Sequence, residues 1–150
     1  MKKLVIFVVG LLVSAGMCAQ SKVYFTREIT PEALVRIYKA LGKEAKGRVA
    51  VKISTGEAGG HNYLKPELIR NLVDEVGGTI VECNTAYAGS RNTSAAHWKT
   101  IRQHGFDKIA KVDIMDEHGD MRIPVKDTTH IKYDIVGASL ANYDFMVNLA

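Results

Sequence analysis

The sequence predicts an α/β fold with three layers, in which a mixed, mostly parallel sheet is flanked by helices. Short β-branched runs alternate along the chain with amphipathic segments long enough to be helices. The two clearest strands, near residues 49–53 and 79–83, are each followed by a polar loop and then by a helical pattern. Strands that alternate with helices favour parallel pairing, because the crossover helix returns the chain to the same end of the sheet.

The composition is that of an ordinary globular domain. Of the 150 residues, 47% are hydrophobic and 24% are charged, which is typical of a chain that folds around a core. We therefore expect a single α/β domain over residues 20–150. The net charge of +4 includes Lys2 and Lys3, and the rest of the chain has no Lys/Arg cluster. The sequence thus predicts no nucleic-acid partner.

Residues 1–19 have the pattern of a signal peptide. Lys2 and Lys3 precede an apolar run over residues 4–13, and small residues follow it up to Ala19. This run is too short to span a bilayer, which needs about 20 residues. We expect cleavage after Ala19, export to the periplasm or the extracellular space, and no stable membrane span afterwards. A lipid anchor on Cys18 is the alternative.

The expected elements can be placed in order along the chain. The first helix begins at Thr30 and Pro31, a hydroxyl cap followed by proline, and ends at Gly42. Residues 116–120 predict a hairpin turn. The other expected helices are 66–76 and 93–104, the latter capped by Thr93 and stopped by Gly105. The expected strands are 22–28, 48–54, 79–83, 109–114, 121–125, 131–136 and 143–149. The last strand is strongly apolar, so we expect it to be buried, and nothing follows it; we therefore expect an incomplete domain, the N-terminal part of a longer one.

Two polar loops follow the second and third expected strands and form the candidate site. The first of them, residues 54–65, is longer than the usual connection of about 2–6 residues between a strand and a helix. If the two strands are parallel neighbours, both loops lie at the same edge of the sheet, where open α/β sheets bind ligands. Alternation along the strand places Glu82 and Asn84 on one face and Cys83 on the other.

Glu57 and His61 are the candidate catalytic residues, because a carboxylate and an imidazole supply acid–base or metal-ligand chemistry. Arg91 is expected to pair with a negative charge on the ligand, and Asn84 and Thr85 to orient it. The candidate ligand-binding residues are Lys52, Thr55, Gly56, Gly59, Gly60, Asn62, Tyr63, Asn84, Thr85, Tyr87 and Arg91. The expected ligand is a small anionic or metal-chelated molecule. The metal, the cofactor and any enzymatic reaction stay unassigned.

Several familiar motifs are absent from the sequence. The first loop lacks the Gly-Lys-Ser/Thr ending of a Walker loop and the glycine spacing of a dinucleotide fingerprint. His97 and His104 are about 10 Å apart along one helix, too far to share a metal alone. We expect both to be partly exposed, and the alternative is that His97 reaches the site. Cys83 is the one cysteine outside the signal peptide, which excludes an intrachain disulfide and indicates a buried small hydrophobe.

The stretch over residues 49–68, Val-Ala-Val-Lys-Ile-Ser-Thr-Gly-Glu-Ala-Gly-Gly-His-Asn-Tyr-Leu-Lys-Pro-Glu-Leu, resembles the family called domain of unknown function 362. So do residues 78–87, 104–106, 112–117 and 143–147. Members are often labelled iron–sulfur centre proteins, because some carry ferredoxin-type cysteine clusters. This chain has two cysteines and no such cluster.

The resemblance covers nearly all of the chain after the signal peptide and implies candidate positions but no reaction. Members are typically longer than this chain, which agrees with an incomplete domain. An iron–sulfur or redox accessory protein and a non-catalytic fragment are therefore the alternative interpretations. An apolar edge left uncovered in such a fragment is expected to drive self-association.

Overall fold

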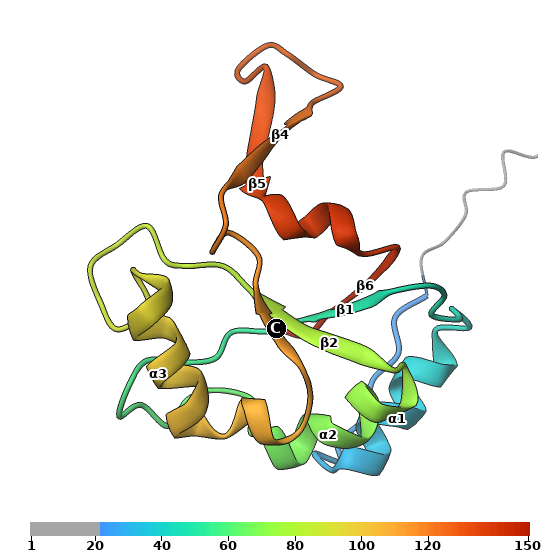
Figure 1. Cartoon of the computed structure of the whole chain (residues 1–150). Helices are drawn as coiled ribbons and strands as arrows, with labels where there is room; N and C mark the ends of the chain where they lie inside the picture. Colours follow the sequence, from blue (N-terminus) through green and yellow to red (C-terminus); the bar gives the residue numbers. More distant parts are fainter. Residues whose placement is uncertain (1–21) are drawn as a thin grey trace, which may run out of the picture.

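The structure is a computed structural model that describes residues 22–150. A four-stranded parallel sheet forms the centre of the protein (Figure 1). The strand order is β3-β2-β1-β6. The four strands are β1 (Val49–Lys52), β2 (Gly78–Glu82), β3 (Val112–Ile114) and β6 (Phe145–Asn148). A separate antiparallel hairpin consists of β4 (Asp120–Pro124) and β5 (Tyr133–Gly137). The α/β prediction is confirmed, and the antiparallel strands form their own small sheet beside the parallel one.

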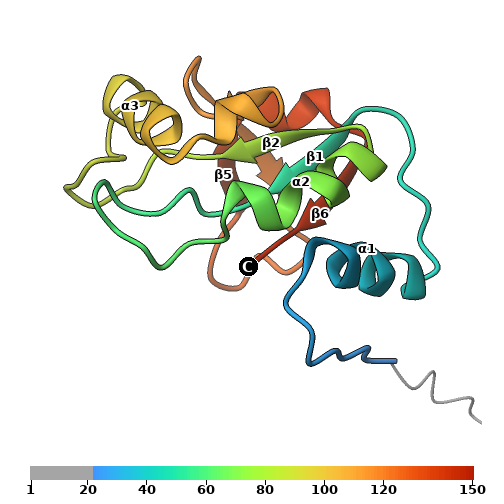
Figure 2. The ribbon, with the colours of Figure 1, turned by 90° about the horizontal axis from the view of Figure 1, so that it is seen from below.

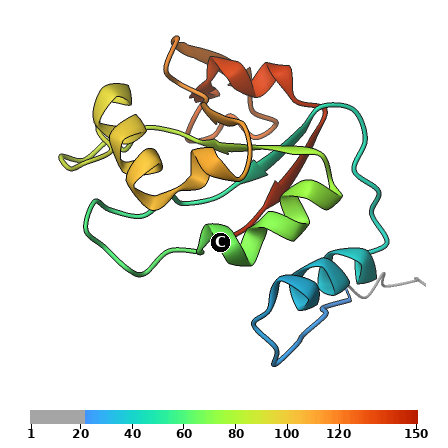
Figure 3. The same cartoon turned by 60° about the horizontal axis from the view of Figure 1, so that its bottom comes forward.

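The helices are α1 (Pro31–Ala40), α2 (Pro66–Glu75) and α3 (Ser94–His104), and their ends follow the predicted signals. The hydroxyl of Thr30 accepts a hydrogen bond from the backbone N–H of Ala33, and Thr93 caps α3 in the same way. Gly105 ends α3 with a φ of 84°, the left-handed conformation that glycine adopts at low cost. In Figure 3, α2 and α3 lie on the same side of the sheet.

The two faces of the sheet carry different cores. Val51 pairs with Ile80, and Ile80 with Val112, so these side chains point together towards α2 and α3 in the larger core. On the opposite face Ala50, Val81 and Met115 form a smaller cluster. Figure 2 shows α1 beyond α2, against which it packs.

The opposite face of the sheet is covered by a short 3₁₀ helix, η2 (Ala138–Asn142), and by the base of the hairpin (Figure 3). Leu140 of η2 packs against the smaller core cluster. The backbone N–H groups of Ala138 and Ser139 donate to the carbonyls of Gly119 and Met115. These bonds fix the base of the hairpin, while the rest of it projects from the body of the protein (Figure 1).

Three expectations about the strands are wrong. Residues 22–30 form no strand, and Val23 and Phe25 are largely exposed; alternation alone does not make a strand where no partner strand pairs with it. The turn at residues 116–120 connects β3 to β4, but these strands belong to different sheets, because β4 pairs with β5. The last strand, β6, is half-exposed rather than buried throughout, since it pairs with β1 alone within the described sheet.

The predicted signal peptide and the alternative anchor, Cys18, lie outside the described residues. A further 3₁₀ helix, η1 (Phe106–Lys108), precedes the strand expected over residues 109–114, and the strand itself begins only at Val112. Within residues 22–150, no helix is both long and apolar enough to cross a membrane.

Candidate functional site

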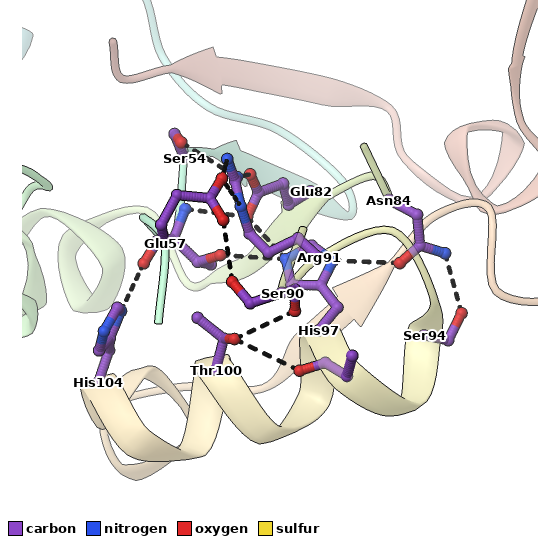
Figure 4. A network of polar contacts seen from close by, with 12 residues as sticks. Ser54, Glu57, Glu82, Asn84, Ser90, Arg91, Ser94, His97, Thr100 and His104 are labelled. Carbon is purple, nitrogen blue, oxygen red and sulfur yellow. Dashed lines mark hydrogen bonds and ion pairs between the residues drawn. The ribbon is translucent and has the colours of Figure 1, made fainter. Parts of the chain in front are cut away.

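The two polar loops lie at the same edge of the sheet, as predicted, because β1 and β2 are parallel neighbours. We call residues 54–65 the glycine-rich loop and residues 84–92 the second loop. Figure 4 shows the polar contacts that join them. These contacts lie on the face of the sheet that carries α3.

Arg91 is the central residue of this network. Its Nε and Nη2 atoms donate to Glu57 Oε1 at 3.1 and 2.6 Å, and its Nη1 donates to a carboxylate oxygen of Glu82. Arg91 is 6% exposed. Burial alone would lower the pKa of Arg91, but the Glu57 and Glu82 carboxylates raise it above its ordinary value, so the guanidinium stays charged. Arg91 forms ion pairs with both neighbouring carboxylates, which disfavours the expected pairing of Arg91 with a ligand.

Glu57 is turned from the glycine-rich loop towards the second loop. Besides its bonds from Arg91, it accepts hydrogen bonds from the hydroxyls of Ser90 at 2.9 Å and Tyr87 at 3.2 Å. These bonds, led by that from Arg91, lower the pKa of the Glu57 carboxyl. The carboxylate is thus an acceptor that holds the two loops together, whereas a general base at neutral pH needs a pKa nearer the operating pH.

His97 lies at the buried end of the network and is completely inaccessible to solvent. Its Nε2 is 3.0 Å from both Glu82 Oε2 and Thr55 Oγ1, and its Nδ1 is 3.2 Å from Asn84 Oδ1. The expectation that His97 is partly exposed is wrong. The histidine faces inwards because Glu82 and Asn84 share the face of β2 that α3 covers, which confirms the predicted alternation.

Acidification is expected to weaken this network through Glu82. Burial raises the pKa of the Glu82 carboxyl, but hydrogen bonds from His97 and Thr55 outweigh burial and hold it below its ordinary value of 4.5. A carboxyl with a lowered pKa stabilises the fold above its unfolded pKa, and this stabilisation is lost as the pH falls through the folded pKa.

We therefore expect the urea midpoint to fall as the pH drops below about 4.5, the unfolded value. Glu82→Gln should be less stable than the parent at neutral pH and should lose less stability on acidification. Equal slopes of stability against pH in the parent and in Glu82→Gln would contradict this assignment.

Tyr63 and Gly56 serve the packing of the glycine-rich loop. The Tyr63 ring stacks on the His104 ring with centroids 4.1 Å apart. Lys65, also in the glycine-rich loop, places its Nζ 3.7 Å from the centroid of the Tyr63 ring. His104 Nδ1 donates to the Thr55 carbonyl at 2.7 Å. Gly56 has a φ of +77°, and a Cβ there would lie 2.7 Å from the Tyr63 ring. A glycine is required at this position for both reasons.

The other candidate residues lie apart from these contacts. His61 is exposed, and no polar contact within the described part of the chain joins it to Glu57. Thr85 donates to the Tyr87 carbonyl, so it stabilises its own loop. Gly59 and Gly60 lie in the turn where Gly60 N–H donates to the Glu57 carbonyl. Asn62 and Tyr63 line a recess of about 410 Å³ with Ser54, Leu64, Leu149 and Ala150.

A larger cavity of about 540 Å³ lies on the opposite face of the sheet, and we call it the hairpin-side cavity. Lys52 and Cys83 reach it because they alternate with the residues that face α2 and α3. Apart from Asn84, its remaining lining comes from residues that follow β3. The complete lining is Lys52, Cys83, Asn84, Met115, Asp116, Gly119, Asp120, Ile135, Val136, Gly137, Leu140 and Met146. Of these residues, Lys52 and Asn84 are among the ligand-binding residues that the sequence predicts, and the others are not.

Charged groups of both signs line this cavity. Lys52 follows the core residues of β1, and Asp116 and Asp120 flank the turn between β3 and β4. None of the ion pairs found among residues 22–150 involves any of these three side chains. Asp116 Oδ1 accepts a hydrogen bond of 2.9 Å from the backbone N–H of Asn84.

Cys83 lies inside the cavity as a protonated thiol. Burial and the nearby Asp116 carboxylate raise the pKa of Cys83 above its ordinary value of 9.0. Since the thiolate is the nucleophilic form, this environment does not activate Cys83 for covalent chemistry. Among the described residues, no group of three or more His, Cys, Asp or Glu side chains could hold a metal ion.

Comparison with known proteins identifies the family. Searches of the curated proteins and of the solved structures give no match. Residues 49–150 match the family model described as Domain of unknown function (DUF362). This match covers β1 to β6, both polar loops and every residue that lines the hairpin-side cavity. The chain therefore belongs to the DUF362 family, whose function is unknown.

Proposed function

We propose that this domain binds a small organic anion in the hairpin-side cavity, with Lys52 as the charged partner of the ligand. The observation that carries the proposal is the place of the cavity: it lies at the carboxyl ends of β1, β2 and β3, where α/β sheets bind ligands. Its volume of about 540 Å³ is within the usual range of small-molecule sites, about 300–1,000 Å³.

The lining suits a ligand with an apolar body and a few polar groups. Met115, Leu140 and Met146 provide apolar surface, and Lys52 provides a cation that forms no ion pair with the described side chains. An ammonium that pairs with a bound carboxylate contributes about 1.5–3 kcal/mol when the pair is hydrogen-bonded. The raised pKa of Cys83 supports reversible rather than covalent binding.

The loop network supports the same site from the other face of the sheet. Arg91 and Glu82 fix the ends of β1 and β2, from which Lys52 and Cys83 reach the cavity. Asn84 contacts His97 with its side chain and Asp116 with its backbone N–H. The network therefore holds the cavity wall in place before a ligand arrives, which reduces the entropy cost of binding.

Titration with N-acetyl-leucine, followed by ¹⁵N–¹H NMR, tests this proposal. We expect saturable shifts at the amides of Cys83, Asp116 and Gly137, and none with the neutral N-acetyl-leucinamide. Lys52→Met should weaken binding by about 10- to 150-fold, because a lost charge-assisted hydrogen bond costs about 1.5–3 kcal/mol. Lys108→Met, on the helix side of the sheet, is the matched control and should bind normally. Equal binding of acid and amide, or full affinity in Lys52→Met, would overturn the proposal.

A further inference from the structure

We infer that the ligand of the hairpin-side cavity is an amphipathic zwitterion of the class to which short apolar peptides belong. This inference rests on the proposed function and adds to it a cationic group on the ligand. The observation behind it is that the same cavity presents one ammonium and two carboxylates, from separate elements, that do not pair with one another.

The charges are placed so that a ligand can lie between them. Lys52 belongs to β1, at the centre of the sheet, whereas Asp116 and Asp120 come from the turn after β3, an outer strand. Asp116 is half-buried, and one of its oxygens already accepts the Asn84 N–H. Its other oxygen makes no hydrogen bond to the part of the chain that the structure describes. A ligand ammonium can bind this oxygen.

Removal of a charge from water is costly unless an opposite charge compensates it. A simple anion would satisfy Lys52 but would bring a second negative charge close to Asp116 and Asp120. A simple cation would leave Lys52 without a partner. A zwitterion compensates both sides of the cavity, so electrostatic complementarity selects it over either singly charged analogue.

The apolar lining indicates what connects the two charges. Met115 and Leu140 cover the inner part of the cavity, while Ile135 and Met146 are exposed at 61% and 40%. Exposed apolar side chains around a cavity are typical of ligand-binding surfaces. Methionine adapts to side chains of different shapes, so two methionines favour a class of apolar ligands over a single compound. A dipeptide with two aliphatic side chains has the charges and the apolar surface that this lining matches.

Three matched peptides separate the contributions of the two charges. Leu-Leu carries both charges, N-acetyl-Leu-Leu lacks the ammonium, and Leu-Leu-amide lacks the carboxylate. We expect isothermal titration calorimetry to show that Leu-Leu binds about 10- to 150-fold more tightly than either analogue, since each lost ionic hydrogen bond costs about 1.5–3 kcal/mol. Free leucine is the fourth ligand, and it should bind more weakly than Leu-Leu because it buries less apolar surface.

Two variants assign the effect to residues. Asp116→Asn keeps an oxygen for the Asn84 N–H but removes the charge, so it should abolish the preference for Leu-Leu over N-acetyl-Leu-Leu. Lys52→Met should weaken both peptides. Asp107→Asn, on the exposed surface of η1, is the control and should retain the preference.

The two proposals fail in different ways. If N-acetyl-Leu-Leu binds as tightly as Leu-Leu, or if Asp116→Asn retains the preference, the zwitterion is overturned and the anion site stands. If no peptide binds in a manner that depends on Lys52, the proposed function itself is overturned. Tighter binding of free leucine than of Leu-Leu would overturn the peptide class.

Discussion

Replacement of Arg91 with alanine is expected to lower the free energy of unfolding by about 3–5 kcal/mol, the cost of breaking a buried ion pair on one side. The reason is the state of Glu82, which is 5% exposed and whose carboxylate loses its guanidinium partner. Glu57 also loses its bonds from Nε and Nη2, so the glycine-rich loop separates from the second loop. Urea unfolding followed by circular dichroism measures the effect.

Arg91→Lys and Arg36→Ala are the informative comparisons. Lysine keeps the charge but has no counterpart to the separate Nε, Nη1 and Nη2 donors of arginine. We therefore expect the free energy of unfolding of Arg91→Lys to lie between that of the parent and that of Arg91→Ala. Arg36 pairs with Glu28 on the surface, and its removal should change stability by no more than about 0.5 kcal/mol. If Arg91→Ala were as stable as Arg36→Ala, the network would not hold the loops.

Gly137→Ala is expected to cost about 1–3 kcal/mol, the usual effect of overpacking a close contact. A Cβ on Gly137 would lie 2.5 Å from the carbonyl carbon of Met115 and 2.7 Å from the backbone nitrogen of Asp116. Because both contacts are with backbone, no change of rotamer relieves them. The φ of −58° is normal for alanine, so the cost is steric. The base of the hairpin must therefore move away from the end of β3.

This movement should also change the hairpin-side cavity, which Gly137 and Asp116 line. We expect Gly137→Ala to weaken the binding of Leu-Leu as well as to lower the urea midpoint. Gly89→Ala is the control, since a Cβ there would be at ordinary contact distance, 3.6 Å from Glu57 Oε2. Unchanged stability and unchanged binding in Gly137→Ala would show that the hairpin base is not held against β3.

The sequence was most informative where a local signal determines the structure. Thr30, Thr93 and Gly105 mark helix ends through bonds and torsions that involve only nearby residues, and all three lie where they were expected. Alternation along β2 also placed Glu82 and Asn84 on the face opposite Cys83, because the strand period is fixed by the backbone.

The sequence was less informative where distant segments meet. α3 buries His97, Thr100 and Ile101. Because two of these three residues are polar, the hydrophobic pattern of the sequence does not show which face of the helix points inwards. The hairpin-side cavity joins Lys52 to residues about 60 to 90 positions later, and no local pattern shows that η2 folds back on the sheet. The pairing of β6 with β1 is equally non-local.

The reactivity of Cys83 can report whether a ligand fills the hairpin-side cavity. Cys83 is half-buried, and its raised pKa keeps the fraction of thiolate small, so alkylation by a neutral maleimide should be slow. Any molecule that fills the cavity shields the sulfur further. The rate at which the peptide containing Cys83 gains the label, followed by mass spectrometry, therefore reports ligand binding without a tag. Candidate ligands of unknown chemistry can be ranked by the protection that they give.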